Sequence, residues 1–332
     1  MNGLQLIEYE MSRQHEDALA SFKNAEAVAR RIAESVKRTG KLCLLGMGGS
    51  HWVNRTVMFA YRELGVEVQA EVLSEVLFRR VPSGPRTVLL VSQSGNSGEI
   101  GHYLKTDPNG EERYGITLNA DSALAAAVPC LIGAGGIEKA FAATRSIFVS
   151  HALHLAILKA LGANVELAYT AMCDSAAYET LEAFNAISNC STLIISGRSE
   201  LQGVAESGAL CLMELARMNT YALEGGQLRH GPFEMLNDKC GAIFLRSDDN
   251  TANLTTALEA DCKKAGVKTV VFDLTGKATI PNTTTIALPR CSGMAAVFTV
   301  LPALQSLLVE IANHKVANVG VPVRSTKVTT TL

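Results

Sequence analysis

The sequence lacks the features that would set it apart from ordinary globular proteins of the cytoplasm. Its 332 residues carry a formal net charge of -2, which gives no electrostatic reason to bind nucleic acid or an anionic membrane. Its eight cysteines include no Cys-x-x-Cys pair, and several lie in apolar runs such as the one around Cys43, so they predict reduced core residues rather than disulfides or a zinc site. The first residues are charged and mixed, so no secretory signal is indicated and we expect a cytoplasmic protein.

Two further absences concern membranes and metals. The longest apolar stretch, residues 294–308, contains Pro302 and Gln305 and is short for a membrane span, so it predicts a buried helix. No group of His, Asp and Glu has the spacing of a metal site. His151 and His154 share a helical face without an adjacent acid, and we expect them in the core or at an interface. The sequence therefore predicts no metal and no organic cofactor.

Composition and hydrophobic pattern predict an α/β protein of two domains. Hydrophobic residues make up 48% of the chain and charged residues 19%, which is typical of globular proteins, and the length suffices for two cores. Short apolar runs alternate with helical periodicity, which predicts parallel sheets covered by helices on both faces. The expected strands are residues 41–45, 66–72, 88–91, 115–118, 130–132, 192–196, 241–245, 269–272 and 285–288.

Helices are expected between these strands. A first helix should run from about residue 10 to 37 and end at Thr39-Gly40, and a long one should run from about residue 141 to 161, with Gly162 near its C-cap. The other expected helical stretches are residues 51–64, 122–127, 165–187, 201–218, 254–265 and the segment after Ser292.

The two halves of the chain resemble each other, which predicts one fold used twice. Residues 42–45 before Gly46 resemble residues 193–195 before Ser196-Gly197, and each half has a second apolar strand followed by a polar turn. The expected division is residues 1–163 for an N-terminal helix and the first domain, 164–320 for the second domain, and 321–332 for a tail. Because the second polar turn is acidic, only the first suits a phosphate.

Ser92-Gln93-Ser94-Gly95, which follows the apolar run 88–91, is the most informative stretch. A helix should begin just after it, with Asn96 or Ser97 as the N-cap. Three serine hydroxyls, an amide and backbone N–H groups at a helix start suit an anion, most simply a phosphate. The alternative is an ordinary capped turn, although capping needs only one hydroxyl. No Gly-Lys-Ser/Thr follows, so a Walker-type nucleotide site is not indicated.

Several motifs together resemble those of the sugar isomerase (SIS) domain family. They are Gly48-Gly49-Ser50, Ser74-Glu75, Ser92-Gln93-Ser94-Gly95 with Ser97, and Arg229-His230-Gly231-Pro232. The chain is similar to the isomerase half of glucosamine-6-phosphate synthase and to its single-chain relatives. The resemblance covers nearly the whole chain and implies two tandem SIS domains, each a doubly wound, flavodoxin-like parallel sheet.

The resemblance implies two sets of substrate contacts. The first set holds the phosphate of a hexose 6-phosphate and falls on Ser50, Ser92, Gln93, Ser94 and Ser97. The second set falls on Gly49, Glu75, Ala143, Thr144 and Arg145, and its last three members end the segment from Glu138 that resembles the family's loop beside the sugar.

The resemblance also implies three catalytic residues: the carboxylate Glu214, the ring-opening histidine His230 and the C-terminal lysine Lys327. Glu214 lies in a mostly apolar helical stretch, where its alternative role is a salt bridge to Arg217 at i+3. The alternative for His230 is a loop histidine bonded to backbone, and for Lys327 it is a free polar tail.

These three groups suit the transfer of a carbonyl between C1 and C2 of a sugar. One carboxylate over both carbons can move the proton through an enediol or enediolamine, and apolar surroundings raise its basicity. A histidine can pass a proton to the ring oxygen. A lysine amine can form a Schiff base with an open-chain ketose, which supplies an electron sink without a cofactor.

Two departures from the family pattern bear on the reaction. Synthases have a lysine three residues before the carboxylate, where this chain has Cys211, and they carry an N-terminal glutaminase domain that we do not expect here. The expected activity is that of an aldose–ketose isomerase, an amino-sugar-phosphate deaminase or a fructosamine 6-phosphate deglycase. A non-catalytic sugar-phosphate-binding regulator and a structural pseudo-enzyme are the alternatives. The resemblance also implies a homodimer or larger even homo-oligomer, with His230 near a subunit boundary.

Overall fold

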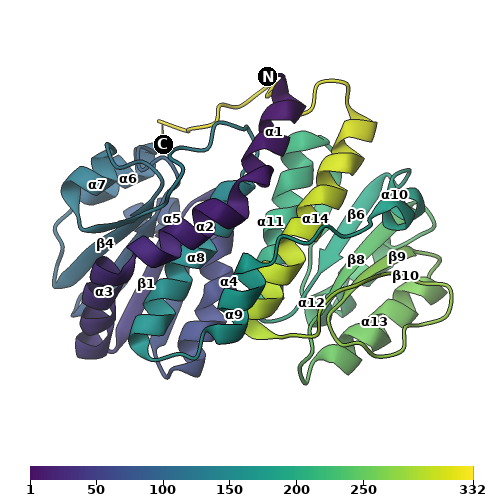
Figure 1. Cartoon of the computed structure of the whole chain (residues 1–332), viewed down its shortest axis with the longest axis horizontal. Coiled ribbons are helices and arrows are strands. Elements are labelled where there is room, and N and C mark those ends of the chain that lie inside the picture. The colour runs from purple at the N-terminus through teal and green to yellow at the C-terminus, as the bar shows by residue number, and fades with distance from the viewer. Residues whose placement is uncertain (332) are drawn as a thin grey trace. The chain divides into compact units, whose positions relative to one another are not determined.

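The chain divides into two compact units in the computed structural model, which describes residues 1–331 (Figure 1). Unit 1 contains Met1, Gln5–Cys173 and the residues from Pro322 onward, and unit 2 contains Asn2–Leu4 and Asp174–Val321. The C-terminal tail therefore belongs to the unit that the first half of the chain builds.

The sequence suggested a division after residue 163, but the division falls after Cys173. The helix α9 (Glu166–Cys173) therefore belongs to unit 1. This helix packs on α2 (Gln14–Asn24). The ring centroids of Phe22 and Tyr169 lie 5.3 Å apart across that contact. Such a contact between distant segments leaves no local signal in the sequence.

Unit 1 contains a five-stranded parallel sheet with the strand order β2-β1-β3-β4-β5. Its strands are β1 (Lys41–Gly46), β2 (Glu67–Val72), β3 (Arg86–Val91), β4 (Glu111–Thr117) and β5 (Cys130–Ile132). Its helices, besides α2 and α9, are α1 (Gly3–Ser12), α3 (Glu26–Thr39), α4 (Gly48–Glu63), α5 (Leu73–Phe78), α6 (Gly98–Leu104), α7 (Ala123–Ala127) and α8 (Arg145–Leu161).

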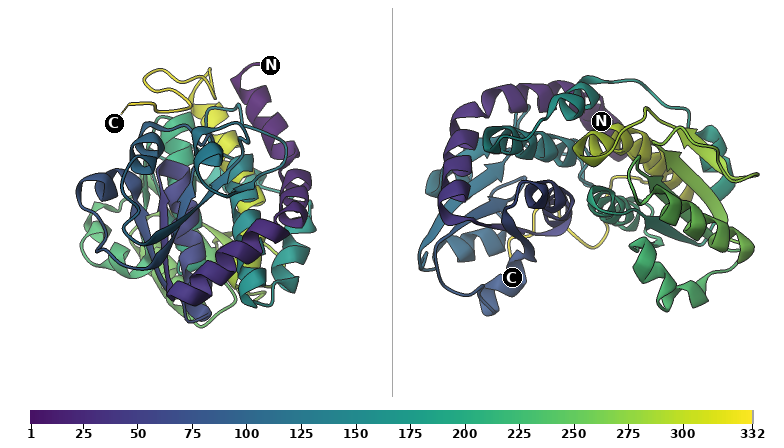
Figure 2. Two further views of the ribbon diagram at one scale, coloured as in Figure 1. Left: turned by 90° about the vertical axis from the view of Figure 1, so that its left-hand side faces the viewer. Right: turned by 90° about the horizontal axis from the view of Figure 1, so that it is seen from below.

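Helices cover both faces of this sheet, as the apolar strands predicted. Every residue of β3 is buried, which a central strand between two helical layers requires. Cys43 and Leu45 of β1 and Val88 and Leu90 of β3 form a core cluster with α5, α6 and α7 on one face. The helices α3, α4 and α8 pack on the other face, and α2 lies alongside α8 (Figure 2).

Unit 2 contains a second five-stranded parallel sheet, with the order β10-β9-β8-β6-β7. Its strands are β6 (Thr192–Ser196), β7 (Asn219–Ala222), β8 (Cys240–Arg246), β9 (Lys268–Asp273) and β10 (Thr284–Ala287). The helical segments are α10 (Leu181–Ile187), α11 (Glu200–Leu215), α12 (Gly225–Arg229), the short 3₁₀-helix η1 (Pro232–Met235), α13 (Ala252–Lys264) and α14 (Gly293–Lys315).

The two sheets have the same strand order. Counted within its own unit, each sheet runs 2-1-3-4-5 with all strands parallel, which is the flavodoxin-like order of doubly wound folds. The expected α/β fold with parallel sheets is therefore confirmed. In each unit the order reverses beside the first strand, so each has a switch point between its first and third strands.

The prediction of a single helix from about residue 10 to 37 is wrong, because three helices occupy this part of the chain. α1 ends at Ser12 and α2 ends at Asn24, and only α3 continues to the expected stop. That stop is Gly40, whose φ of 67° is in the left-handed region that a helix C-cap commonly uses. The amphipathic spacing persisted across the breaks, so periodicity alone did not reveal them.

Among residues 1–331, α14 is one helix with the length and apolar composition of a membrane span. Within its apolar window 83% of the residues are buried in the protein, and the helix packs on α10 and α11. Burial by neighbouring helices is what the core helix of a globular domain shows, as expected for residues 294–308. In the same described part of the chain, no three His, Cys, Asp or Glu side chains are placed to hold a metal ion.

Candidate functional site

The serine-rich turn lies at the switch point of the first sheet. The last residues of β1 and β3, Gly46 and Val91, are paired neighbours. α4 follows β1 onto one face of the sheet and α6 follows β3 onto the other, so the two strand ends flank the topological switch point of the sheet. The segments that lead from these ends to Ser50 and Ser97 therefore start side by side at the edge where doubly wound proteins bind ligands.

Hydrogen bonds shape the turn without using up its hydroxyls. Ser92 Oγ accepts a bond from the Gly95 N–H at 3.1 Å, and Ser94 Oγ accepts one from the Asn96 N–H at 3.3 Å. A hydroxyl that accepts one bond keeps its hydrogen for donation. Ser97 is the N-cap residue of α6, but its side chain makes no capping bond. Helix capping therefore does not explain these hydroxyls.

Gly95 makes the tight path of the turn possible. Its φ is 64°, which is in the left-handed region, and an added Cβ would lie 2.3 Å from Ser122 Oγ and 2.9 Å from Thr117 Oγ1. The Gly95 carbonyl oxygen accepts a bond from the Leu124 N–H at 3.1 Å. Only glycine meets both the conformational and the steric requirement.

A loop between β5 and α8 approaches the turn that follows β1. A Cβ added to Gly49 would lie 2.9 Å from Ile147 Cδ1 and 3.6 Å from the Ala143 Cβ, so Gly49 and Ala143 are neighbours. The Ser74 N–H approaches Met47 Sδ at 3.4 Å, which brings the start of α5 to the same place, with Glu75 exposed beside it. The structure thus brings Gly49, Ala143 and the start of α5 together near the end of β1.

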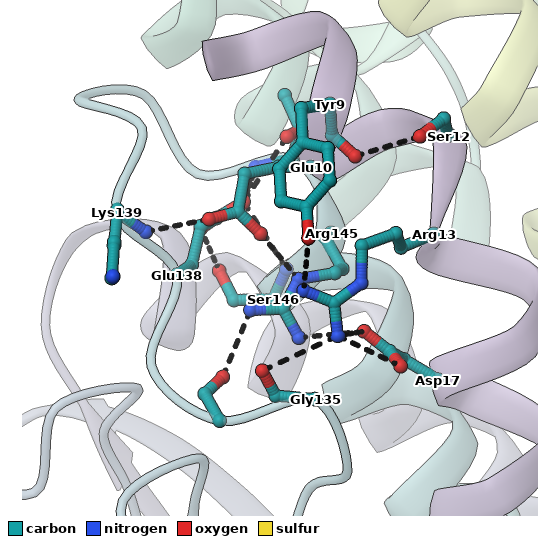
Figure 3. A network of polar contacts seen from close by, with 12 residues as sticks. Tyr9, Glu10, Ser12, Arg13, Asp17, Gly135, Glu138, Lys139, Arg145 and Ser146 are labelled. Atoms are coloured by element: carbon teal, nitrogen blue, oxygen red, sulfur yellow. Dashed lines mark hydrogen bonds and ion pairs between the residues drawn. The ribbon is translucent and has the colours of Figure 1, made fainter. Parts of the chain in front are cut away.

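Arg145 does not have the geometry of a substrate contact. Its side chain is fully buried, and its guanidinium donates to Glu10 Oε2 at 2.6 Å, Asp17 Oδ2 at 3.0 Å and the Gly136 carbonyl oxygen at 2.8 Å (Figure 3). Glu10 Oε1 also accepts a bond from the Lys139 N–H at 2.7 Å. The expected contact between Arg145 and a substrate is replaced by a role in fastening the loop to α1 and α2.

A second buried group, Glu138, fixes the other side of the loop. Its Oε1 accepts bonds from Thr144 N at 2.9 Å and Thr144 Oγ1 at 3.1 Å, and its Oε2 accepts one from Ser146 Oγ. The carboxylate therefore caps the start of α8, where negative charge is stabilised. Burial alone would raise the pKa of Glu138, but the charge of Lys327 and the bonds from Ser146 and Thr144 outweigh it and hold the pKa below its usual range.

The C-terminal tail is not free, contrary to the default for a polar tail. Lys327 Nζ lies 3.2 Å from Glu138 Oε2 and donates to the Phe141 carbonyl oxygen at 3.3 Å. Two residues further on, the Thr329 carbonyl oxygen accepts a bond from the Gly98 N–H at 3.1 Å. The expected catalytic lysine therefore lies between the loop and the serine turn of its own unit.

The helices that carry Glu214 and precede His230 lie on opposite faces of the second sheet. α11 packs on α14, and its Gly208 lies against Ile195. α12 places Leu228 in the cluster that includes Ile194, and alternate strand residues face opposite sides. The sheet of unit 2 thus separates the two helices. Glu214 is half-buried and His230 is exposed.

The ion-pair alternative for Glu214 depended on a helical i, i+3 geometry that does not exist. α11 ends at Leu215, and Arg217 lies beyond it with a φ of 53°. Its guanidinium donates to Asn318 Oδ1 at 3.0 Å and to the Val321 carbonyl oxygen at 2.8 Å. Arg217 therefore fastens the segment after α14.

Sequence reasoning missed Glu10, Asp17 and the role of Glu138. One signal was available. Glu10 and Asp17 are seven residues apart, so they lie on the same side of an amphipathic helical stretch. Buried acids require a partner, but the sequence did not identify Arg145 as that partner.

The two units and the turn define a doubly wound α/β protein with a hydroxyl-lined turn at the switch point of its first sheet. Residues 186–310, which lie in unit 2, match the family described as SIS domain.

The chain is 26% identical to a glutamine–fructose-6-phosphate aminotransferase (isomerizing) of Rhizobium meliloti over 306 residues, which are 86% of this chain and 48% of that protein. It thus spans about half the length of the curated relatives it matches, and it is homologous to them. The C-terminal domain of glucosamine-fructose-6-phosphate aminotransferase from Francisella tularensis has the same fold, with a TM-score of 0.82, 19% identity and coverage of 93% of this chain and 96% of that one. Tagatose-6-phosphate ketose/aldose isomerase from Escherichia coli also has this fold, with a TM-score of 0.80 and 17% identity. The match covers 96% of this chain and 97% of that one.

Proposed function

We propose that unit 1 is a second SIS domain and that its serine turn binds the phosphate of a hexose 6-phosphate. The equal strand order of the two sheets supports the first part of this proposal. The hydroxyls of Ser92, Ser94 and Ser97, none of them explained by capping, support the second. Ser50 lies in the first turn of α4, which follows the end of β1 beside β3.

The protein then acts at C1 and C2 of the bound sugar phosphate, as an isomerase, a deaminase or a fructosamine 6-phosphate deglycase. The observation that carries this proposal is the position of Lys327. Gln93 of the serine turn donates to the Glu138 carbonyl oxygen at 3.4 Å, and the Glu138 carboxylate holds Lys327 Nζ at 3.2 Å. An amine beside a phosphate site can form a Schiff base with an open-chain ketose phosphate.

Glu214 is the proposed proton-transferring base, and His230 is the proposed ring-opening group. Because α11 and α12 lie on opposite faces of the second sheet, we assign His230 to a site other than the one that its own Glu214 serves. A homodimer in which each copy supplies His230 to its partner satisfies this requirement. Three residues before Glu214, where the synthases have a lysine, this chain has Cys211. Ammonia-dependent synthesis is therefore not part of the proposal.

Turnover of three substrates tests the proposal. The protein is incubated separately with fructose 6-phosphate, glucosamine 6-phosphate and a fructosyl-amino acid 6-phosphate, and aldose phosphate, ammonia and free amine are measured. We expect one of these products from a phosphorylated substrate and none from the same sugar without its phosphate. Binding without any product would favour a sugar-phosphate-binding regulator and contradict an enzyme.

The phosphate assignment has its own test. Replacing Ser92 and Ser94 together by Ala is expected to weaken fructose 6-phosphate binding at least about tenfold, or 1.4 kcal/mol, because two hydroxyl donors are lost. Calorimetry measures the affinity, and Ser12→Ala, an exposed serine on α1, is the matched control. An unchanged affinity in the double variant would overturn the assignment.

A further inference from the structure

The amine of Lys327 is held at two points by one loop. Glu138 Oε2 lies 3.2 Å from Nζ and the Phe141 carbonyl oxygen lies 3.3 Å from it, so the ammonium contacts a charge and a dipole together. The Lys327 side chain is 23% exposed, whereas that of Glu138 is 0% exposed. The contact is therefore accessible only from the lysine side.

The carboxylate of Glu138 cannot follow the lysine if the tail moves. Bonds from Thr144 and Ser146 fix both of its oxygens to the first turn of α8, a helix of 17 residues. The ion network of Arg145 fastens the same segment to α1 and α2. Glu138 is thus held on several sides, whereas Lys327 lies in a segment without helix or strand.

Glu138 also connects this pair to the serine turn. Its carbonyl oxygen accepts the bond from Gln93 Nε2, and the tail reaches α6 through the bond from Gly98 to Thr329. One residue therefore links three segments: the serine turn by its backbone, and the loop and the tail by its carboxylate.

We propose that Glu138 is the positioning residue that holds the Lys327 amine beside the serine turn. The catalytic importance of this inference rests on the proposed function, in which Lys327 is the group that reacts with the sugar. Glu138 remains ionised and does not take part in bond formation. It keeps the amine within reach of the turn and fixes the tail to the loop.

A labelling experiment tests the pairing without any substrate. The full-length protein is treated with a small amount of acetic anhydride at constant pH, and acetylation of Lys327 is followed by mass spectrometry. In Glu138→Gln we expect Lys327 to react at least about threefold faster, because the ion pair no longer holds the amine against the loop. Ser146→Ala, which removes another bond to Glu138 and leaves the ion pair, is the control and should label within about twofold of the wild type.

A second carboxylate variant guards against loss of the fold. Glu138→Asp keeps the charge at the start of α8 but withdraws the carboxylate from Lys327, so we expect an intermediate labelling rate. Thermal unfolding shows whether each variant is folded. Equal labelling of Lys327 in the wild type and in both Glu138 variants would overturn the pairing.

Kinetics test whether the pairing serves the reaction. On a substrate that the wild type converts, Glu138→Gln should lower kcat by about tenfold and leave KM within about threefold. In the Lys327→Ala background the same change should cause no further loss, because Glu138 acts through Lys327. Losses that multiply would overturn the positioning role. A wild type that converts none of the substrates would defeat the proposed function, while the labelling result would still decide the pairing.

Discussion

Replacing Glu214 by Gln is expected to lower turnover by about 10²-fold or more while changing substrate binding little. The amide keeps the size and much of the hydrogen bonding of the carboxylate but cannot accept a proton from C1 or C2. The phosphate contacts proposed for unit 1 are untouched, so calorimetric affinity for a sugar phosphate should stay within about threefold. Steady-state rates on the substrate that the wild type converts measure the effect. Full activity in this variant would place the base elsewhere.

Mixing two inactive variants separates a shared site from a self-contained one. If a homodimer shares its sites, Glu214→Gln and His230→Ala combined at equal amounts should regain about a quarter of wild-type activity after subunit exchange, because half of the dimers are hybrids with one intact site of two. His230→Ala mixed with itself is the control. No recovery, with exchange demonstrated independently, would contradict a site completed by a second copy.

Replacing Arg145 by Met is expected to reduce the free energy of unfolding by about 3–5 kcal/mol. The change leaves the carboxylates of Glu10 and Asp17 without their buried cation, and both residues are less than one-tenth exposed. Urea unfolding followed by circular dichroism measures the loss.

Arg38→Met is the matched control for this prediction. Arg38 also pairs with an acid, Glu112, but its side chain is 60% exposed, so its removal should reduce the free energy of unfolding far less than the removal of Arg145 does. A loss for Arg145→Met as small as that for Arg38→Met would show that the buried network contributes little to stability.

The strands that flank the switch point beside the serine turn could be predicted because they are central. β1 and β3 are buried on almost every residue, so they appear in the sequence as continuous apolar runs. β7 was not predicted, because its four residues, Asn219–Ala222, form no apolar run and its single buried residue is the polar Thr220. The edge strands β5 and β10 are as short, but they contain the apolar residues that the sequence pattern detects.

The serine turn could be predicted for a different reason, namely that it is local. Its hydroxyls, its glycine and its helix start lie within one short stretch, and Gly95 has the left-handed conformation that this residue permits. Arg145 shows where local reasoning fails. Its partners Glu10 and Asp17 are 135 and 128 residues away in sequence, and only the packing of α1 and α2 against the loop turns a presumed substrate contact into a buried ion network.

The pairing of Glu138 with Lys327 also orders events during synthesis of the chain. The two residues are 189 positions apart, so at 5–20 residues per second Lys327 leaves the ribosomal decoding site roughly 10–40 s after Glu138. During that interval the strands of the first sheet are complete, but the carboxylate at the start of α8 lacks its cation. The nascent first unit therefore carries a serine turn without its lysine, and it gains that lysine only after the whole second sheet has been translated.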